Sequence, residues 1–226
     1  MTHPTTDSLP RIAFIGGGNM ARSLVGHLLG AISGASVARG TSFLKDRMGQ
    51  RIFAPGIMIV DDPHRPRGMR SKPFDGEGLA NGRRNLIEDG VLTTWLLDLA
   101  SARQLGLQPT GHAARGTGGP PSPSSSNTHL AAGNLSPEEL IADIEQGFYV
   151  TEMMGHGANM VTGDYSRGAA GFMIRNGECA EPVSEITIAG NLREMFARVV
   201  PADDLKFRRG TDAPTIRIDG LTVAGA

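Results

Sequence analysis

The residue types best able to bind a metal ion or act as a nucleophile are few and scattered in this sequence. Cys179 is the single cysteine, which excludes an intrachain disulfide and any zinc module built from several cysteines. No two of the six histidines have the spacing that would bring both to one face of a helix as metal ligands; they are His3, His27, His64, His112, His129 and His156. The sequence therefore predicts no metal site and no catalytic residue in this chain.

A glycine-rich turn near the start of the sequence has the pattern of a dinucleotide-binding loop. The apolar run from Arg11 to Ile15 predicts a strand, and the segment from Met20 to Leu29 predicts a helix. Between them, Gly16, Gly18 and Ala21 satisfy G-x-G-x-x-A, in which backbone N–H groups and a helix N-terminus bind a pyrophosphate. A complete site also needs further alternating strands and helices, and no such series follows. These three residues are the candidate cofactor-binding residues, and a glycine turn that binds nothing is the alternative.

A second glycine-rich segment, MMGHGANMVTGDYSRG, is a candidate peptide-binding site. Gly155 and Gly157 flank His156, and residues without a side chain allow the backbone of a bound peptide to approach closely. The alternative is that His156 is a hydrogen-bonded structural residue. The neighbouring methionines suit either an adaptable surface for varied peptides or the filling of gaps in the core; they are Met153, Met154 and Met160.

Two long polar segments lack the periodicity of a helix or a strand. Residues 61–84 combine prolines and glycines with charges of both signs, and we expect a loop in which these charges neutralise one another. The charged residues concerned are Arg65, Arg67, Arg70, Asp61, Asp62 and Asp75. Residues 112–126, HAARGTGGPPSPSSS, have the composition of a flexible linker, and an ordered functional loop is the alternative.

Composition narrows the class of protein. Among 226 residues, 22 Lys and Arg face 23 Asp and Glu, so the net charge of -1 gives no reason to expect binding to nucleic acid. No apolar run approaches the roughly 20 residues that cross a bilayer, and the first residues lack a signal-peptide pattern, so we expect a cytoplasmic protein without membrane contact. With 31 Gly, 14 Pro and 5% aromatic residues, the chain is expected to be rich in loops.

Local signals predict a strand-rich α+β fold with short helices. The clearest helix start is Ser136-Pro137, where Glu139 completes a capping box and the apolar face continues to Phe148. The clearest turn is Asn176-Gly177, which predicts a β-hairpin. The sequence also predicts helices at 42–48, 101–105 and 191–199, and strands at 56–60, 90–97, 183–188, 215–218 and 221–223.

A series of motifs runs through most of the chain. In order, they include GAISGASVARGTSFLKDRMG, DDPHRPRGMRSKPFDGEG, LIEDGVLTTWLLD, GTGGPPSPSSSN, MMGHGANMVTGDYSRGAAGFMIRNGE and EITIAGNLREMF. In content and order, they resemble the C-terminal half of the TldD/PmbA family of zinc-dependent peptidases. Residues 11–24, with IAFIGGGNMARSL, instead resemble the N-terminus of pyrroline-5-carboxylate reductase. These resemblances imply a Rossmann-type βα fragment at residues 1–22, a TldD/PmbA C-terminal domain at residues 23–226, and no family N-terminal domain.

Within that family, the resemblance points to the PmbA branch, also called TldE. The catalytic TldD branch holds zinc with the helical motif H-E-x-x-x-H, and this sequence contains no His-Glu pair. The resemblance implies a non-catalytic subunit without a cofactor of its own, paired with a zinc-bearing TldD-type subunit that degrades or matures unstructured peptides. The alternatives are a fragment of an NAD(P)H-dependent reductase and a fused or truncated gene product without activity.

Overall fold

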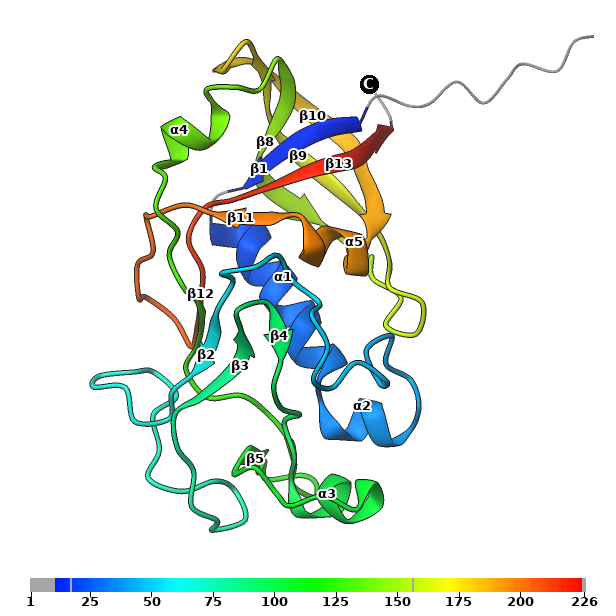
Figure 1. Cartoon of the computed structure of the whole chain (residues 1–226), viewed down its shortest axis with the longest axis vertical. Coiled ribbons are helices and arrows are strands. Elements are labelled where there is room, and N and C mark those ends of the chain that lie inside the picture. Colours follow the sequence, from blue (N-terminus) through cyan, green and yellow to red (C-terminus); the bar gives the residue numbers. More distant parts are fainter. Residues whose placement is uncertain (1–10, 17, 156, 225–226) are drawn as a thin grey trace, which may run out of the picture.

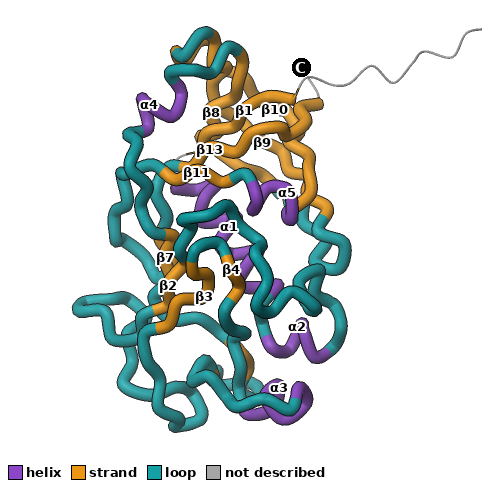
Figure 2. Tube along the Cα trace, in the orientation of Figure 1, coloured by secondary structure: helices purple, strands orange, loops and turns teal. Residues whose placement is uncertain are grey.

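The computed structural model describes residues 11–16, 18–155 and 157–224. Two larger β-sheets lie one above the other in Figure 1, with helix α1 (Gly18–Ala31) between them. Figure 2 shows that the long loops gather in the lower half of the molecule. The strand-rich α+β class predicted from the sequence is confirmed. Within the described residues, no helix has the length and apolar character that crossing a bilayer requires.

The upper sheet contains six strands. In spatial order they are β1 (Arg11–Gly16), β8 (Gln146–Met154), β9 (Asp164–Arg175), β10 (Glu178–Asn191), β13 (Ile216–Ala224) and β11 (Val199–Pro201). Strand β1 pairs in parallel with β8 and antiparallel with β13, so the pairings close into a ring to which β11 is added. The predicted strand and helix around the glycine turn are confirmed, and the strand is part of this sheet. The division of the chain at residue 22 stays a prediction.

Turn residues shape this sheet at two places. Asn176 and Gly177, with φ of 51° and 82°, form the predicted turn between β9 and β10, because a two-residue hairpin loop favours positive φ at both positions. The predicted strands at 215–218 and 221–223 are confirmed as strand from Ile216 onward, but the predicted break between them is wrong, because the segment is the single strand β13. Gly220, with φ of 79°, lies in a bulge opposite β1 and lets the strand continue.

The lower sheet contains five strands. In spatial order they are β12 (Thr211–Asp212), β7 (Thr128–Leu130), β2 (Ile59–Asp61), β3 (Arg84–Glu88) and β4 (Val91–Leu92). Strand β3 was not expected, and the predicted strand at 90–97 is wrong beyond Leu92. Asp89 and Gly90, both with positive φ, form a tight turn that pairs β3 with the two residues of β4.

Four short helices accompany α1. They are α2 (Gly34–Ala38), α3 (Leu99–Leu105), α4 (Pro137–Ile141) and α5 (Leu192–Ala197). The capping box of Ser136 and Glu139 is confirmed, but α4 ends at Ile141 because the chain from Gln146 onward pairs with β9. Phe148 therefore packs from a strand rather than a helix. Residues 42–48 form turns instead of the predicted helix, and α2 was not expected.

One hydrophobic core joins the two sheets through α1 and α5. Leu24, Val25 and Leu28 of α1 are at most 5% exposed. Phe196 of α5 stacks on Phe53 with ring centroids 4.5 Å apart, which ties the upper sheet to the segment before β2. Helix α1 is therefore held between the two sheets.

The segment 112–126 is an ordered loop, which confirms one of the two interpretations that the sequence left open and excludes the flexible linker that its composition suggests. It contains the short strands β5 (Ala113–Ala114) and β6 (Ser122–Pro123), which pair with each other. Its ends are buried, with His112 4% and Ser126 2% exposed. Composition suggested a linker because Gly, Pro and Ser lack apolar side chains, whereas polar contacts hold this loop.

Gly171 of β9 is predicted to be essential for the upper sheet. It lies opposite a bulge at Thr151 of β8, where a Cβ would overlap the Tyr149 carbonyl oxygen. Gly168 on the same strand has only an ordinary 3.5 Å contact with the Cβ of Met154. We expect Gly171→Ala to lower the free energy of unfolding by more than about 2 kcal/mol and Gly168→Ala to change it by less than about 1 kcal/mol. Equal effects in urea unfolding would contradict this account.

Candidate functional site

A pocket of about 560 Å³ lies between α1 and the connection from β8 to β9. The lining residues are Ser23, Gly26, His27, Gly30, Ser36, Gly157, Ala158, Met160 and Arg167. The four from α1 have the spacing i, i+3, i+4 and i+7, which places them on one face of the helix. The opposite face of α1 fills the core, so the helix both stabilises the fold and forms one wall of the pocket.

Three polar side chains are held together at this wall. Arg167 Nη1 donates a hydrogen bond of 2.8 Å to Ser23 Oγ. His27 Nδ1 lies 2.6 Å from the Ser23 carbonyl oxygen, and because a carbonyl oxygen only accepts, Nδ1 carries the proton. The His27 ring also packs edge-on against Tyr165, with centroids 5.7 Å apart. The neutral ring keeps a lone pair on Nε2.

The surroundings favour a neutral imidazole and a neutral phenol beside a charged guanidinium. Burial lowers the pKa of His27, the Ser23 carbonyl works in the opposite direction, and the Arg167 charge lowers the pKa further. Burial raises the pKa of Tyr165 to about 12. At neutral pH the site therefore offers one cationic donor and one uncharged ring with an acceptor nitrogen. These groups match the C=O and N–H groups of a peptide backbone.

Of the predicted peptide-binding residues, Gly157 lies in the pocket wall and Gly155 lies just outside it. Gly157 lines the pocket, and a Cβ there would overlap the Ser166 carbonyl oxygen, so the close backbone approach requires glycine. Gly155 is an exposed residue with φ of 74° just before the pocket. His156 lies outside the described residues. Met160 also lines the pocket, where its side chain lies against Gly30.

The three candidate cofactor-binding residues lie together at the start of α1. Gly16 ends β1, Gly18 begins α1, and Ala21 is fully buried in the first turn. A Cβ at Gly18 would lie 3.6 Å from the Ala213 carbonyl oxygen, so the segment after β12 packs against this helix end. Nucleotide binding by these residues stays a prediction.

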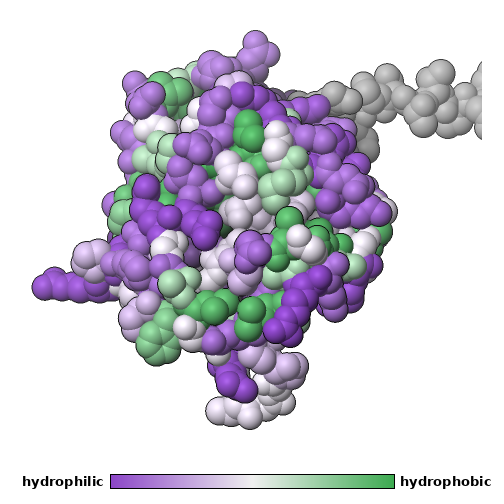
Figure 3. Space-filling model, turned by 60° about the horizontal axis from the view of Figure 1, so that its bottom comes forward, coloured by the Kyte–Doolittle hydropathy of each residue, from purple (hydrophilic) through white to green (hydrophobic). Residues whose placement is uncertain are grey.

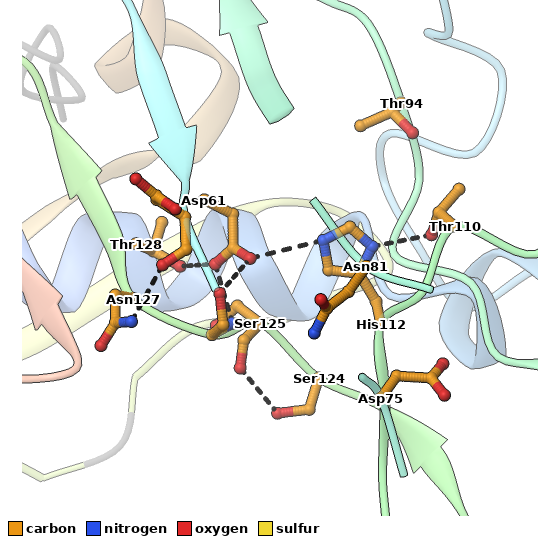
Figure 4. A network of polar contacts seen from close by, with 12 residues as sticks. Asp61, Asp75, Asn81, Thr94, Thr110, His112, Ser124, Ser125, Asn127 and Thr128 are labelled. Carbon is orange, nitrogen blue, oxygen red and sulfur yellow. Dashed lines mark hydrogen bonds and ion pairs between the residues drawn. The ribbon is translucent and has the colours of Figure 1, made fainter. Parts of the chain in front are cut away.

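Figure 4 shows a second polar group, centred on Asp61 at the end of β2. None of its residues is among those that line the pocket. Asp61 Oδ1 accepts hydrogen bonds from the Ser126 N–H (2.8 Å) and Thr128 Oγ1 (2.7 Å), and Oδ2 accepts one from Ser126 Oγ (2.6 Å). His112 Nε2 lies 3.5 Å from Oδ2, and Thr110 Oγ1 lies 2.8 Å from His112 Nδ1. We refer to these five residues as the Asp61 network.

The Asp61 network stabilises the fold rather than facing a ligand. Asp61 is 1% exposed, and Ser126 and Thr128 are similarly buried. Burial acts to raise the pKa of Asp61, but the hydrogen bonds from His112, Ser126 and Thr128 and the charge of His112 outweigh it and hold the pKa below its usual range. The carboxylate is therefore ionised and joins β2, the 112–126 loop and β7.

No group of three His, Cys, Asp or Glu side chains among the described residues is arranged to hold a metal ion. Cys179 is exposed on β10 and lies away from the pocket lining. The expected mutual neutralisation within residues 61–84 is wrong. Arg65 pairs instead with Asp212, at 3.4 Å, and the carboxylates of Asp62 and Asp75 accept hydrogen bonds from backbone N–H groups of their own loop.

Sequence analysis missed His27 and Arg167 as site residues. Arg167 gave no signal, because its position on β9 opposite α1 depends on tertiary packing. The face of α1 that lines the pocket did give a signal in the sequence. It is a continuous stripe of small and polar residues on a helix whose other face is apolar, namely Ser23, Gly26, His27 and Gly30. Such a stripe indicates that this face is not packed in the core.

Comparisons with known proteins place the chain in one family. The family described as PmbA/TldA metallopeptidase C-terminal domain matches residues 13–225. The metalloprotease PmbA of Escherichia coli O157:H7 is 44% identical over 207 residues, covering 91% of this chain and 44% of that protein. A PmbA homolog of Haemophilus influenzae is 38% identical over 210 residues, covering 92% of this chain and 44% of its own length.

Solved structures agree with the sequence comparison. TldE from Thermococcus kodakarensis has a TM-score of 0.86 and 25% identity, covering 97% of this chain and 51% of that one. The chain belongs to the PmbA/TldD metallopeptidase family, and its sequence corresponds to the C-terminal half of its members. It spans less than half the length of the curated relatives described here.

The Asp61 network should control stability in acid. Because the pKa of Asp61 is lowered in the folded protein, its stabilising effect is present above the ordinary carboxyl pKa of about 3.9 and is lost as the pH falls through the lower folded pKa. Asp61→Asn is expected to cost about 2–4 kcal/mol at pH 7. As the pH is lowered below about 4, the unfolding free energy of the Asp61→Asn variant should fall less steeply than that of the unmodified protein. Asp203→Asn, at an exposed carboxyl, is the control, and an unchanged acid slope in Asp61→Asn would be inconsistent with this role.

His27 is expected to titrate below the usual histidine pKa of about 6.5. Arg167→Gln should raise that pKa, because it removes the neighbouring positive charge while leaving burial in place. Histidine side-chain NMR signals recorded across pH 4–8 would measure both values. Arg175→Gln, at the far end of β9, serves as the control, and a His27 pKa insensitive to Arg167 would rule out the proposed electrostatic contact.

Proposed function

We propose that this chain acts as a PmbA/TldE-like, non-catalytic subunit of a cytoplasmic two-subunit zinc metalloprotease that degrades or matures unstructured peptides. The observation that carries the proposal is that His27 and Arg167 line the same pocket, where Arg167 is bonded to Ser23. A fixed guanidinium repels a divalent cation, whereas it donates readily to peptide carbonyl oxygens. In this proposal the zinc belongs to a TldD-type partner, and this chain holds the peptide.

The pocket chemistry supports binding of extended peptide rather than bond cleavage. Arg167 supplies N–H donors, and neutral His27 supplies an acceptor nitrogen. Gly157 brings backbone to the pocket wall, and Met160 provides an apolar surface that adapts to different side chains. Backbone recognition with an adaptable wall suits substrates that share no sequence. The lining residues include no carboxylate or cysteine, and the Ser23 hydroxyl is bonded to Arg167 rather than to the neutral His27 ring, the one side chain there that could act as a general base.

Zinc content and peptide cleavage test the proposal together. The purified chain alone is expected to retain no stoichiometric zinc after dialysis and to leave an unfolded peptide uncleaved. Adding a TldD-type subunit from the same organism should produce cleavage that a chelator abolishes. Arg167→Gln should reduce the rate of the mixture at low peptide concentration by about tenfold, the loss of one charged hydrogen bond, whereas Arg103→Gln on α3 should not.

Two results would overturn this assignment. One is about one zinc per chain together with chelator-sensitive cleavage by the chain alone. The other is peptide cleavage by the TldD-type subunit at the same rate with and without this chain, since the pocket would then contribute nothing to the reaction.

A further inference from the structure

The loop from Asp62 to Arg83 carries more positive than negative charge, because it contains five Lys and Arg and three Asp and Glu. Asp62 and Asp75 bond to backbone N–H groups, and among the described residues no ion pair joins either carboxylate to an arginine of the loop. Among the described residues, neither Arg67 nor Arg70 is ion-paired. The loop forms the left edge of the molecule in Figure 1, and Figure 3 shows mainly hydrophilic residues along that edge. The sequence expectation of a neutral loop therefore fails on its exposed side.

A second segment adds to this charge. Residues 207–209 lie against the loop, and together the two segments surround a hollow of about 330 Å³. We define the arginine patch as the six exposed residues Arg67, Met69, Arg70, Phe207, Arg208 and Arg209. Met69 is 75% and Phe207 is 54% exposed, so apolar surface accompanies the four cationic side chains. Arg208 and Arg209 also lack an ion-pair partner among the described residues.

Arg65 fixes the base of the arginine patch. Its guanidinium pairs with buried Asp212 at 3.4 Å and lies 4.6 Å from the centre of the Phe207 ring. Because Arg65 and Asp212 neutralise each other, the net positive charge of the patch comes from the exposed arginines above them. The same contact holds Phe207 in place at the surface.

Backbone contacts hold the loop in one conformation. Asn127 is fully buried, and its side-chain oxygen accepts the Arg70 N–H at 2.9 Å while its nitrogen donates to the Asp62 carbonyl oxygen, also at 2.9 Å. A Cβ at Gly68 would lie 2.6 Å from the Asn127 side-chain nitrogen. A Cβ at Gly210 would overlap the Arg70 side chain. A surface ordered in advance loses little conformational entropy when a partner binds.

Neighbouring groups respond to the positive potential. Burial lowers the pKa of Arg22 on α1, and the charge of Arg209 lowers it further, while Asp212 works in the opposite direction. Burial also lowers the pKa of His129 on β7, with additional lowering by Arg65 and Arg83 and opposite contributions from Asp212 and Asp62. The arginines of this region thus act on both groups, although burial is the larger cause of each shift.

We infer that the arginine patch is a docking surface for an acidic segment of the TldD-type subunit, one that carries an apolar side chain next to its carboxylates. The inference rests on the proposed pairing of two subunits. Arginine binds carboxylates with two parallel hydrogen bonds, and Arg, Met and aromatic residues are enriched at the centre of protein interfaces. The apolar Met69 and Phe207 distinguish this surface from one suited only to a polyanion. Burying these exposed side chains against another apolar side chain favours binding.

Binding between the purified chain and the TldD-type subunit, measured by surface plasmon resonance at 50 and 300 mM NaCl, tests this surface. The double variant Arg67→Glu/Arg209→Glu is expected to weaken binding at least about tenfold, mainly through slower association, and to reduce the salt dependence. Met69→Ser should weaken binding about threefold or more at both salt concentrations, because it removes apolar rather than charged contact. Arg39→Glu/Arg115→Glu, an equal charge change at exposed positions elsewhere, is the control and should bind normally.

The outcomes separate this inference from the proposed function. If the unmodified chain does not bind the TldD-type subunit, the pairing itself is wrong and the inference falls with it. If the unmodified chain binds and Arg67→Glu/Arg209→Glu binds equally well with the same salt dependence, the pairing stands and the docking surface is overturned. If that variant instead loses binding to a duplex DNA probe while still binding the subunit, the patch is a polyanion site and the inference is wrong.

Discussion

The carboxylate of Asp61 is the contact on which the lower half of the molecule depends. A buried carboxylate costs several kcal/mol unless charged or strongly polar donors surround it, and here Ser126, Thr128 and His112 supply them. Asp61 ends β2, so the loop from residue 62 onward starts from a fixed point. The same carboxylate also holds both ends of the 112–126 loop. One ionised group thus orders two long segments that contain too few apolar residues to form a core of their own.

The upper half depends on α1 and on the strands that surround it. The apolar face of α1 is packed in the core, and its small and polar face remains open because Gly26 and Gly30 leave room for a pocket. The bulge at Thr151 shifts the register of β8 against β9 just before the chain turns toward Gly157 and Met160. The elements that stabilise the fold therefore also form the pocket. Arg167 reaches Ser23 only because β9 passes α1 at this point.

Local signals in the sequence predicted those elements whose chemistry is complete within a few residues. The Ser136 capping box, the Asn176-Gly177 turn and the strand and helix around Gly16 and Gly18 all form as expected. Family resemblance, carried by motifs spread along the chain, also predicted the C-terminal half of the PmbA/TldD family correctly.

The features that the sequence did not predict depend on residues far apart in the chain. The composition of the 112–126 segment did not show what would order it, because Ser126 donates to Asp61, a residue 65 positions earlier that no local pattern connects to it. Likewise, α4 ends early because the following residues pair with β9, and Arg65 pairs with Asp212 rather than with the nearby aspartates. The His27 and Arg167 pair was missed for the same reason.

In the proposed function, the α1 pocket binds peptide without a metal ion. Chemical-shift mapping of the ¹⁵N-labelled chain, with an unstructured peptide added in the presence of a chelator, tests this directly. We expect saturable shifts in the amides of Ser23 to Gly30 and of Gly157 to Met160, and little change around Asp61. Arg167→Gln should weaken these shifts. Peptide-induced shifts that require zinc, or that leave the α1 pocket unaffected, would show that the pocket does not bind peptide in this way.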